Sequence, residues 1–120
     1  MERSFTEKLK TITLAADGWD ELPELIMYDH ISGEPQPYSY TDYPLSDQLL
    51  ERLKTWCTEY EPLTGLTIKE LEGRRDTVDA LDSMGIALLK ELGSELSGRL
   101  SCRLIYYSRG RDTSIFNMEV

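Results

Sequence analysis

The chain has 120 residues, of which 40% are hydrophobic and 29% charged, a balance typical of one soluble globular domain over residues 1–120. Its formal net charge is −9 and its pI is about 4.5, which excludes DNA, RNA and anionic membranes as favoured ligands, because they attract cationic surfaces. The apolar runs are too short to cross a membrane and the N-terminus lacks the order of a secretory signal, so we expect a cytoplasmic protein.

The negative charge is concentrated in one part of the sequence. Between Thr11 and Glu51 there are nine acidic residues and no Lys or Arg, which accounts for the whole net charge. We therefore expect a neutral scaffold that displays one acidic stretch, and such a stretch attracts a basic protein partner. The predicted partner-binding residues are Asp17, Trp19, Asp20, Glu21, Tyr38, Tyr40 and Asp42.

The first part of the chain has the pattern of β-structure. Alternation around Ile12 and Leu14 predicts a strand over 8–16, and a second strand candidate covers 25–31. Prolines at both ends of 36–44 disfavour a helix, so this segment is either an edge strand or an extended loop. Its tyrosines have two interpretations, because their rings either cover the core or form part of an interface.

Two amphipathic helices are predicted in the middle of the chain. The first covers 46–60, with Ser46 as its N-cap and Pro62 as its end. Residues 65–71 have the pattern of a weak strand. The second helix covers 77–96, with Asp76 as its cap, and contains Gly85 within its apolar face. Glycine there costs about 1 kcal/mol of helix propensity, so we expect another segment to approach the backbone closely.

The chain ends in a predicted hairpin. Residues 100–107 alternate in the manner of a strand, 108–112 form the turn, and the return strand passes through Ile115, Phe116 and Met118. The elements together predict an α+β fold, an antiparallel sheet of about four to five strands with two amphipathic helices packed on one face. A mixed sheet is the alternative, because each helix could connect two parallel strands.

Catalytic and metal-binding patterns are weak. His30 is the one histidine, and we interpret it as a structural or surface residue. Cys57 and Cys102 fall on apolar positions, so we interpret both cysteines as reduced core residues. Acids spaced by three along the second helix could ligate magnesium, although a solvated helix face is the favoured interpretation. Among them Asp82 borders the apolar face, so we expect it to bond to a neighbouring element or a partner. We predict no catalytic residue, cofactor or metal, and a carboxylate hydrolase is the least favoured function.

The middle of the chain carries an ordered set of motifs. Tyr43-Pro44-Leu45-Ser46 leads into a first group, which is Leu49, Arg52-Leu53, Trp56 and Glu59-Tyr60. A second group follows, which is Leu81-Asp82, Gly85, Leu88-Leu89, Leu92 and Glu95-Leu96. This order resembles small bacterial immunity proteins, including those paired with contact-dependent growth inhibition toxins.

The resemblance implies a function and a partner. It implies a cytoplasmic, non-catalytic inhibitor that binds the toxic C-terminal domain of a large effector. Many such toxins are nucleases with basic clefts, which an acidic inhibitor suits. The resemblance transfers no binding residues, because interfaces differ between subfamilies. The alternative is an adaptor or assembly subunit that binds a basic protein other than a toxin.

Overall fold

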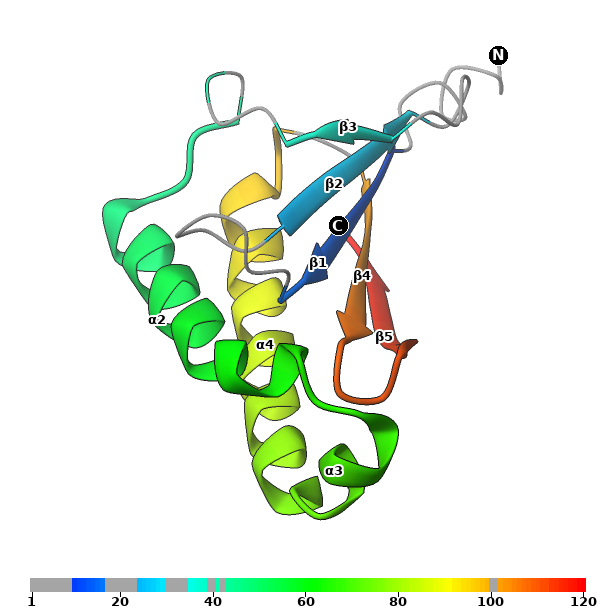
Figure 1. The fold of residues 1–120 in the computed structure, drawn as a ribbon. Coiled ribbons are helices and arrows are strands. Elements are labelled where there is room, and N and C mark those ends of the chain that lie inside the picture. Colours follow the sequence, from blue (N-terminus) through cyan, green and yellow to red (C-terminus); the bar gives the residue numbers. More distant parts are fainter. Residues whose placement is uncertain (1–9, 17–23, 30–34, 39–40, 42, 100–101) are drawn as a thin grey trace.

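The structure is a computed structural model that describes residues 10–16, 24–29, 35–38, 41, 43–99 and 102–120. Figure 1 shows helices α2 and α4 packed on one side of a sheet, with the short α3 at the end of the helical layer. The predicted α+β class is confirmed. The elements in chain order are β1 (Lys10–Ala15), β2 (Glu24–Asp29), β3 (Pro35–Pro37), α2 (Asp47–Thr64), α3 (Ile68–Glu72), α4 (Arg75–Leu96), β4 (Cys102–Ser108) and β5 (Thr113–Glu119).

The sheet is mixed, in the order β3-β2-β1-β4-β5. All neighbouring strands are antiparallel except β1 and β4, which run parallel, with Lys10 opposite Cys102 and Leu14 opposite Tyr106. The predicted purely antiparallel sheet is therefore wrong, and the mixed alternative is the one observed. The physical reason is that the described helices α2, α3 and α4 lie between β3 and β4 and form a crossover, which returns the chain to the sheet in the direction of β1.

The core lies between the two central strands and the helices α2 and α4. Ile12 from β1, Leu104 from β4 and Trp56 from α2 are each 0% exposed. Both cysteines are free and buried, which confirms their predicted place in the core. Burial raises the pKa of the Cys102 thiol to about 11, because the charged thiolate is poorly solvated there.

Helix α2 begins where the sequence predicts and ends later. The Ser46 hydroxyl accepts a hydrogen bond from the Leu49 amide at 3.2 Å, which confirms the predicted N-cap. The predicted end at Pro62 is wrong, because the helix continues to Thr64. A proline so close to a C-terminus removes a single backbone bond, and Leu63, which is 3% exposed, anchors the last turn in the core.

The weak strand predicted over 65–71 is also wrong, because Ile68–Glu72 is the helix α3. A capping box begins this helix. The Thr67 hydroxyl accepts from the Glu70 amide at 3.2 Å, and the Glu70 carboxylate accepts from the Thr67 amide at 2.9 Å. The bonds that the Glu70 carboxylate accepts from the Thr67 amide and hydroxyl lower the pKa of this carboxyl.

Helix α4 begins earlier than predicted. It starts at Arg75 with Arg74 as N-cap, so Asp76 lies in the first turn and is not the cap. Arg74 makes no capping bond with its side chain. Asp76 instead places a negative charge near the positive end of the helix dipole.

Gly85 is the point at which α4 meets the aromatic core. A Cβ atom there would collide with the Tyr106 ring and lie 2.8 Å from Trp56 Cζ2. This confirms the close approach predicted from the sequence. Both rings are 0% exposed, so neither can move aside into solvent.

We expect Gly85→Ala to lower the free energy of unfolding by about 1–3 kcal/mol, because overpacking outweighs the gain in helix propensity. Gly73→Ala is a matched control, since its Cβ would meet only one atom, at 3.5 Å. That control should be neutral or stabilising by about 0.4–1 kcal/mol. Urea unfolding measures both variants, and equal stabilities would contradict the steric explanation.

Candidate functional site

Tyr38 is the only predicted partner-binding residue that the structure describes. It is 5% exposed, and its hydroxyl donates a hydrogen bond to the Tyr43 carbonyl at 2.6 Å. In the structure Tyr38 thus belongs to the core and presents little surface to a partner. This agrees with the interpretation that the tyrosine rings of this segment cover the core. The other predicted residues lie outside the described part of the chain, namely Asp17, Trp19, Asp20, Glu21, Tyr40 and Asp42.

The solvent side of α2 continues the acidic stretch into the described structure. Arg52 on this helix is paired with Glu91 of α4, so its charge is already neutralised. Lys54 is the other base of the helix and is half-buried. Among the ion pairs between described residues, none involves the exposed acids of α2, so their charge is available to a partner. We call these acids the α2 acidic face: Asp47, Glu51, Glu59 and Glu61.

The start of this face is fixed to the end of α4. The Glu95 carboxylate accepts from the Ser46 amide at 2.7 Å and from the Ser46 hydroxyl at 2.6 Å. Arg99 donates to the Pro44 carbonyl at 3.1 Å. The α2 acidic face is therefore held on a rigid pair of helices, which preorganises its charges for binding.

Asp82 is the buried charged group of the described core, at 3% exposure. One carboxylate oxygen accepts from the hydroxyls of Tyr60 at 2.9 Å and Tyr106 at 2.7 Å. The other accepts from the Ser108 hydroxyl at 2.8 Å and lies 3.4 Å from Arg111 Nε. This confirms that Asp82 bonds to neighbouring elements. We call these five residues the Asp82 cluster.

The Asp82 cluster fixes the turn between β4 and β5 to the helices. The Gly110 amide donates to the Tyr60 hydroxyl at 2.9 Å, and the Arg111 amide donates to the Ser108 hydroxyl at 3.1 Å. Burial raises the pKa of Tyr60 and of Tyr106, so both hydroxyls stay protonated as donors. Because both oxygens of the carboxylate are occupied in the interior, the cluster supports a structural role better than a catalytic one.

The acids of α4 do not converge on a metal site. Asp79 is exposed and pairs with Arg111. Asp82 is buried, and both of its carboxylate oxygens already have hydrogen-bond or ion-pair partners. In the described residues no group of three or more His, Cys, Asp or Glu could hold a metal ion. His30 lies outside the described residues.

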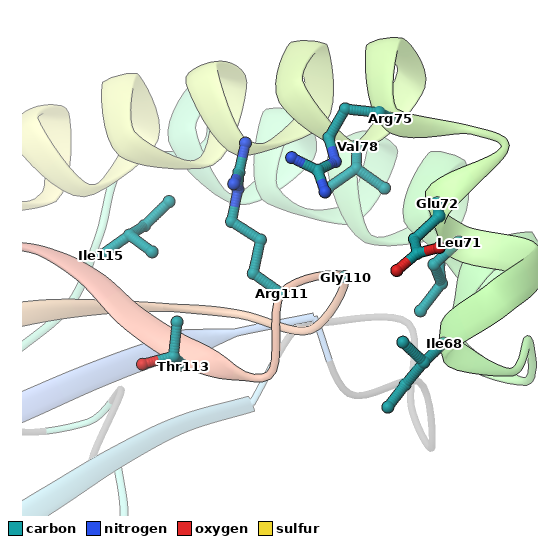
Figure 2. Close-up of a pocket in the computed structure, with 9 residues that line it drawn as sticks. All are labelled: Ile68, Leu71, Glu72, Arg75, Val78, Gly110, Arg111, Thr113 and Ile115. Carbon is teal, nitrogen blue, oxygen red and sulfur yellow. The ribbon is translucent and has the colours of Figure 1, made fainter.

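A hollow of about 390 Å³ lies between α3, the start of α4 and the β4–β5 turn (Figure 2). A second hollow of about 340 Å³ adjoins it along α4 and shares Arg111 and Ile115. Neither hollow was predicted from the sequence, because both depend on how α4 meets the end of the hairpin, and the first depends also on α3, which was predicted as a strand. The first hollow is lined by Ile68, Leu71, Glu72, Arg75, Val78, Gly110, Arg111, Thr113 and Ile115.

Ile115 reaches these hollows through a β-bulge. The pairing steps from Tyr106 opposite Phe116 to Tyr107 opposite Ser114, so Ile115 has no partner in the ladder. A bulge changes the direction in which a side chain points, and Ile115 borders both hollows at 39% exposure. The adjacent apolar pair Ile115-Phe116 is the sequence signal for it, because strict alternation places only one of two neighbours in the core.

Within the described part of the chain, no helix has the length and apolar character needed to span a bilayer. Comparison with protein family models, with curated protein sequences and with solved structures gives no match to this chain, so inferences about its function rest on its own residues.

Proposed function

We propose that this protein is an immunity protein that binds a basic toxin domain, most simply a nuclease, and neutralises it without catalysis. The observation that carries the proposal is the α2 acidic face, which begins within the base-free stretch between Thr11 and Glu51. The resemblance of the chain between Tyr43 and Tyr107 to immunity proteins supports the same function.

The electrostatics favour fast capture of a cationic partner. Complementary charge raises association rates towards about 10⁸–10⁹ M⁻¹s⁻¹ at low ionic strength, compared with about 10⁵–10⁶ M⁻¹s⁻¹ for neutral surfaces. Three of the bases in the described structure already have acidic partners. Arg52 pairs with Glu91, Arg103 pairs with Glu119, and Arg111 pairs with acids of α4.

The Asp82 cluster supports an inhibitor better than an enzyme. A catalytic carboxylate needs an open position from which to meet a substrate atom. Asp82 borders the second hollow, but it is 3% exposed and both of its oxygens already have partners in the protein. Binding through a preformed surface is the function that this arrangement favours.

The α2 acidic face can be tested with two variants of equal charge change. Glu51→Lys replaces a negative charge on the face by a positive one, so the net charge rises by two. Ser114→Lys with Asn117→Lys raises the net charge by the same amount at exposed positions of β5. We expect Glu51→Lys to slow association with the toxin domain that this proposal predicts in a neighbouring gene by about tenfold at low salt, with the difference shrinking at high salt. The β5 variant should retain a near wild-type rate.

Stopped-flow association at several salt concentrations measures these rates. Asp20→Lys with Glu21→Lys tests the acidic residues outside the described part in the same way. A wild-type rate that is unchanged between low and high salt would count against electrostatic attraction. Binding without inhibition of the toxin would instead indicate an adaptor.

A further inference from the structure

The hollow beside α3 exposes apolar surface on an ordered element. Helix α3 buries none of its own residues, and its capping box fixes its start. Its Ile68 is 75% exposed, and Ile115 across the hollow is 39% exposed. Ordered apolar side chains that face water around a concave site are typical of interaction surfaces. Of the large hydrophobic residues exposed in the described structure, only Met84 lies away from this hollow.

Two opposite charges border the same space. Glu72 from α3 and Arg75 from α4 both line it, as Figure 2 shows. Arg111 also lines it but is held by Asp79 and Asp82. Within the described structure, the side chains of Glu72 and Arg75 have no ion-pair or hydrogen-bond partner, so one acceptor and one donor group are available beside the apolar walls.

We propose that this hollow binds an apolar, uncharged peptide segment of a partner protein. A peptide group complements both charges, because its carbonyl accepts from Arg75 while its N–H donates to Glu72. A segment with a net charge of either sign would be attracted by one of these groups and repelled by the other, so the pair favours neither sign of net charge. Apolar side chains of the segment pack against Ile68 and Ile115, which lie on opposite sides of the hollow (Figure 2).

The size of the hollow agrees with this occupant. A cavity of about 150 Å³ holds a benzene molecule, so about 390 Å³ accommodates one or two apolar side chains with part of their backbone. The site differs in chemistry from the α2 acidic face, which attracts positive charge. This inference goes beyond the proposed function and does not depend on the partner being a toxin.

A phage-displayed library of short linear peptides tests the site with a defined probe. The full-length protein selects binders, and the Ile68→Asp variant removes those that bind elsewhere. We expect enriched peptides with apolar side chains and no net charge. A synthetic peptide from this set should lose at least about tenfold in affinity, measured by calorimetry, for Ile68→Asp and for Ile115→Asp.

Met84→Asp is the matched control, because Met84 is 42% exposed on α4 and does not line the hollow. It should bind the peptide within about twofold of wild type, whereas Arg75→Ala and Glu72→Ala should each lose about threefold to tenfold. Circular dichroism checks that each variant is folded. Because Ile68 lies on α3 and Ile115 on β5, one of the two variants can still test the site if the other is unstable.

Three results would overturn the proposal. The first is a library that enriches no peptide able to distinguish wild type from Ile68→Asp, and the second is enrichment of charged peptides that need only one of Arg75 and Glu72. The third is a wild-type dimer in solution that Ile68→Asp dissociates, which would assign the hollow to a second copy of this chain. Each result leaves the toxin-inhibition assay unaffected, so failure of this inference is distinguishable from failure of the proposed function.

Discussion

Replacement of Asp82 with alanine should lower the free energy of unfolding by about 3–5 kcal/mol. The carboxylate is 3% exposed and accepts from the hydroxyls of Tyr60, Tyr106 and Ser108. Its removal leaves these buried donors without their acceptor and leaves Arg111 without its inner partner. Urea unfolding followed by circular dichroism measures the change.

Asp79→Ala is the control for the Asp82 prediction. Asp79 lies on the same helix and also pairs with Arg111, but its side chain is 50% exposed. Pairs at the surface contribute about 0–1 kcal/mol, so this variant should remain close to wild type. If the two variants were equally stable, the Asp82 cluster would not be the connection that holds the turn.

Trp56→Ala should also cost about 3–5 kcal/mol, because it empties the centre of the core. Trp56 is 0% exposed, its ring centroid lies 5.8 Å from that of Tyr60 and 6.0 Å from that of Tyr106, and its indole N–H donates to the Leu81 carbonyl at 2.8 Å. Circular dichroism during urea unfolding is the suitable measurement, because the substitution removes a tryptophan fluorophore.

Trp56→Phe separates the two contributions of this residue. It keeps an aromatic ring and loses the hydrogen bond to Leu81, so we expect a smaller loss than for alanine. Thr58→Ala, at an exposed position of the same helix, should change stability by less than about 0.5 kcal/mol. A loss for Trp56→Ala as small as that for Thr58→Ala would contradict the core packing.

The Asp82 cluster also links the two surfaces to which we assign binding. Tyr60 belongs to α2, which carries the acidic face, and Arg111 lines the hollow. Loss of Asp82 should therefore disturb both surfaces at once. Tests of binding should use exposed positions such as Glu51 and Ile68, where a substitution changes the surface and leaves the core intact.

Much of the fold was predictable because its signals are local. The Ser46 cap and the apolar face of α2 depend on residues a few positions apart, the hairpin joins two strands that follow one another in the chain, and Gly85 stands out as a glycine within an apolar helix face. The errors arose where two local signals competed. Thr67 and Glu70 form a capping box, yet the alternation around Ile68 suggested a strand, and burial of Leu63 outweighed the break expected at Pro62.

The candidate sites were less predictable. The acidic character of α2 is visible in the sequence, whereas the place of Tyr38 in the core is not, since a tyrosine suits either a core or an interface. The hollow required α3, the β4–β5 turn and the bulge at Ile115 to come together. No spacing of residues along the chain predicts that these three segments lie together.

The sequence by itself determined the α+β class, the Ser46 cap, the apolar faces of the two long helices and the uneven distribution of charge, because these follow from side-chain chemistry and short-range periodicity. The tertiary structure alone decided that β1 pairs in parallel with β4, that Asp82 is bound by groups 22 to 26 residues away, and that Ile68 and Ile115 face one hollow. Those features depend on how a helical crossover folds back over the sheet, which is a balance of long-range packing that a local pattern does not specify.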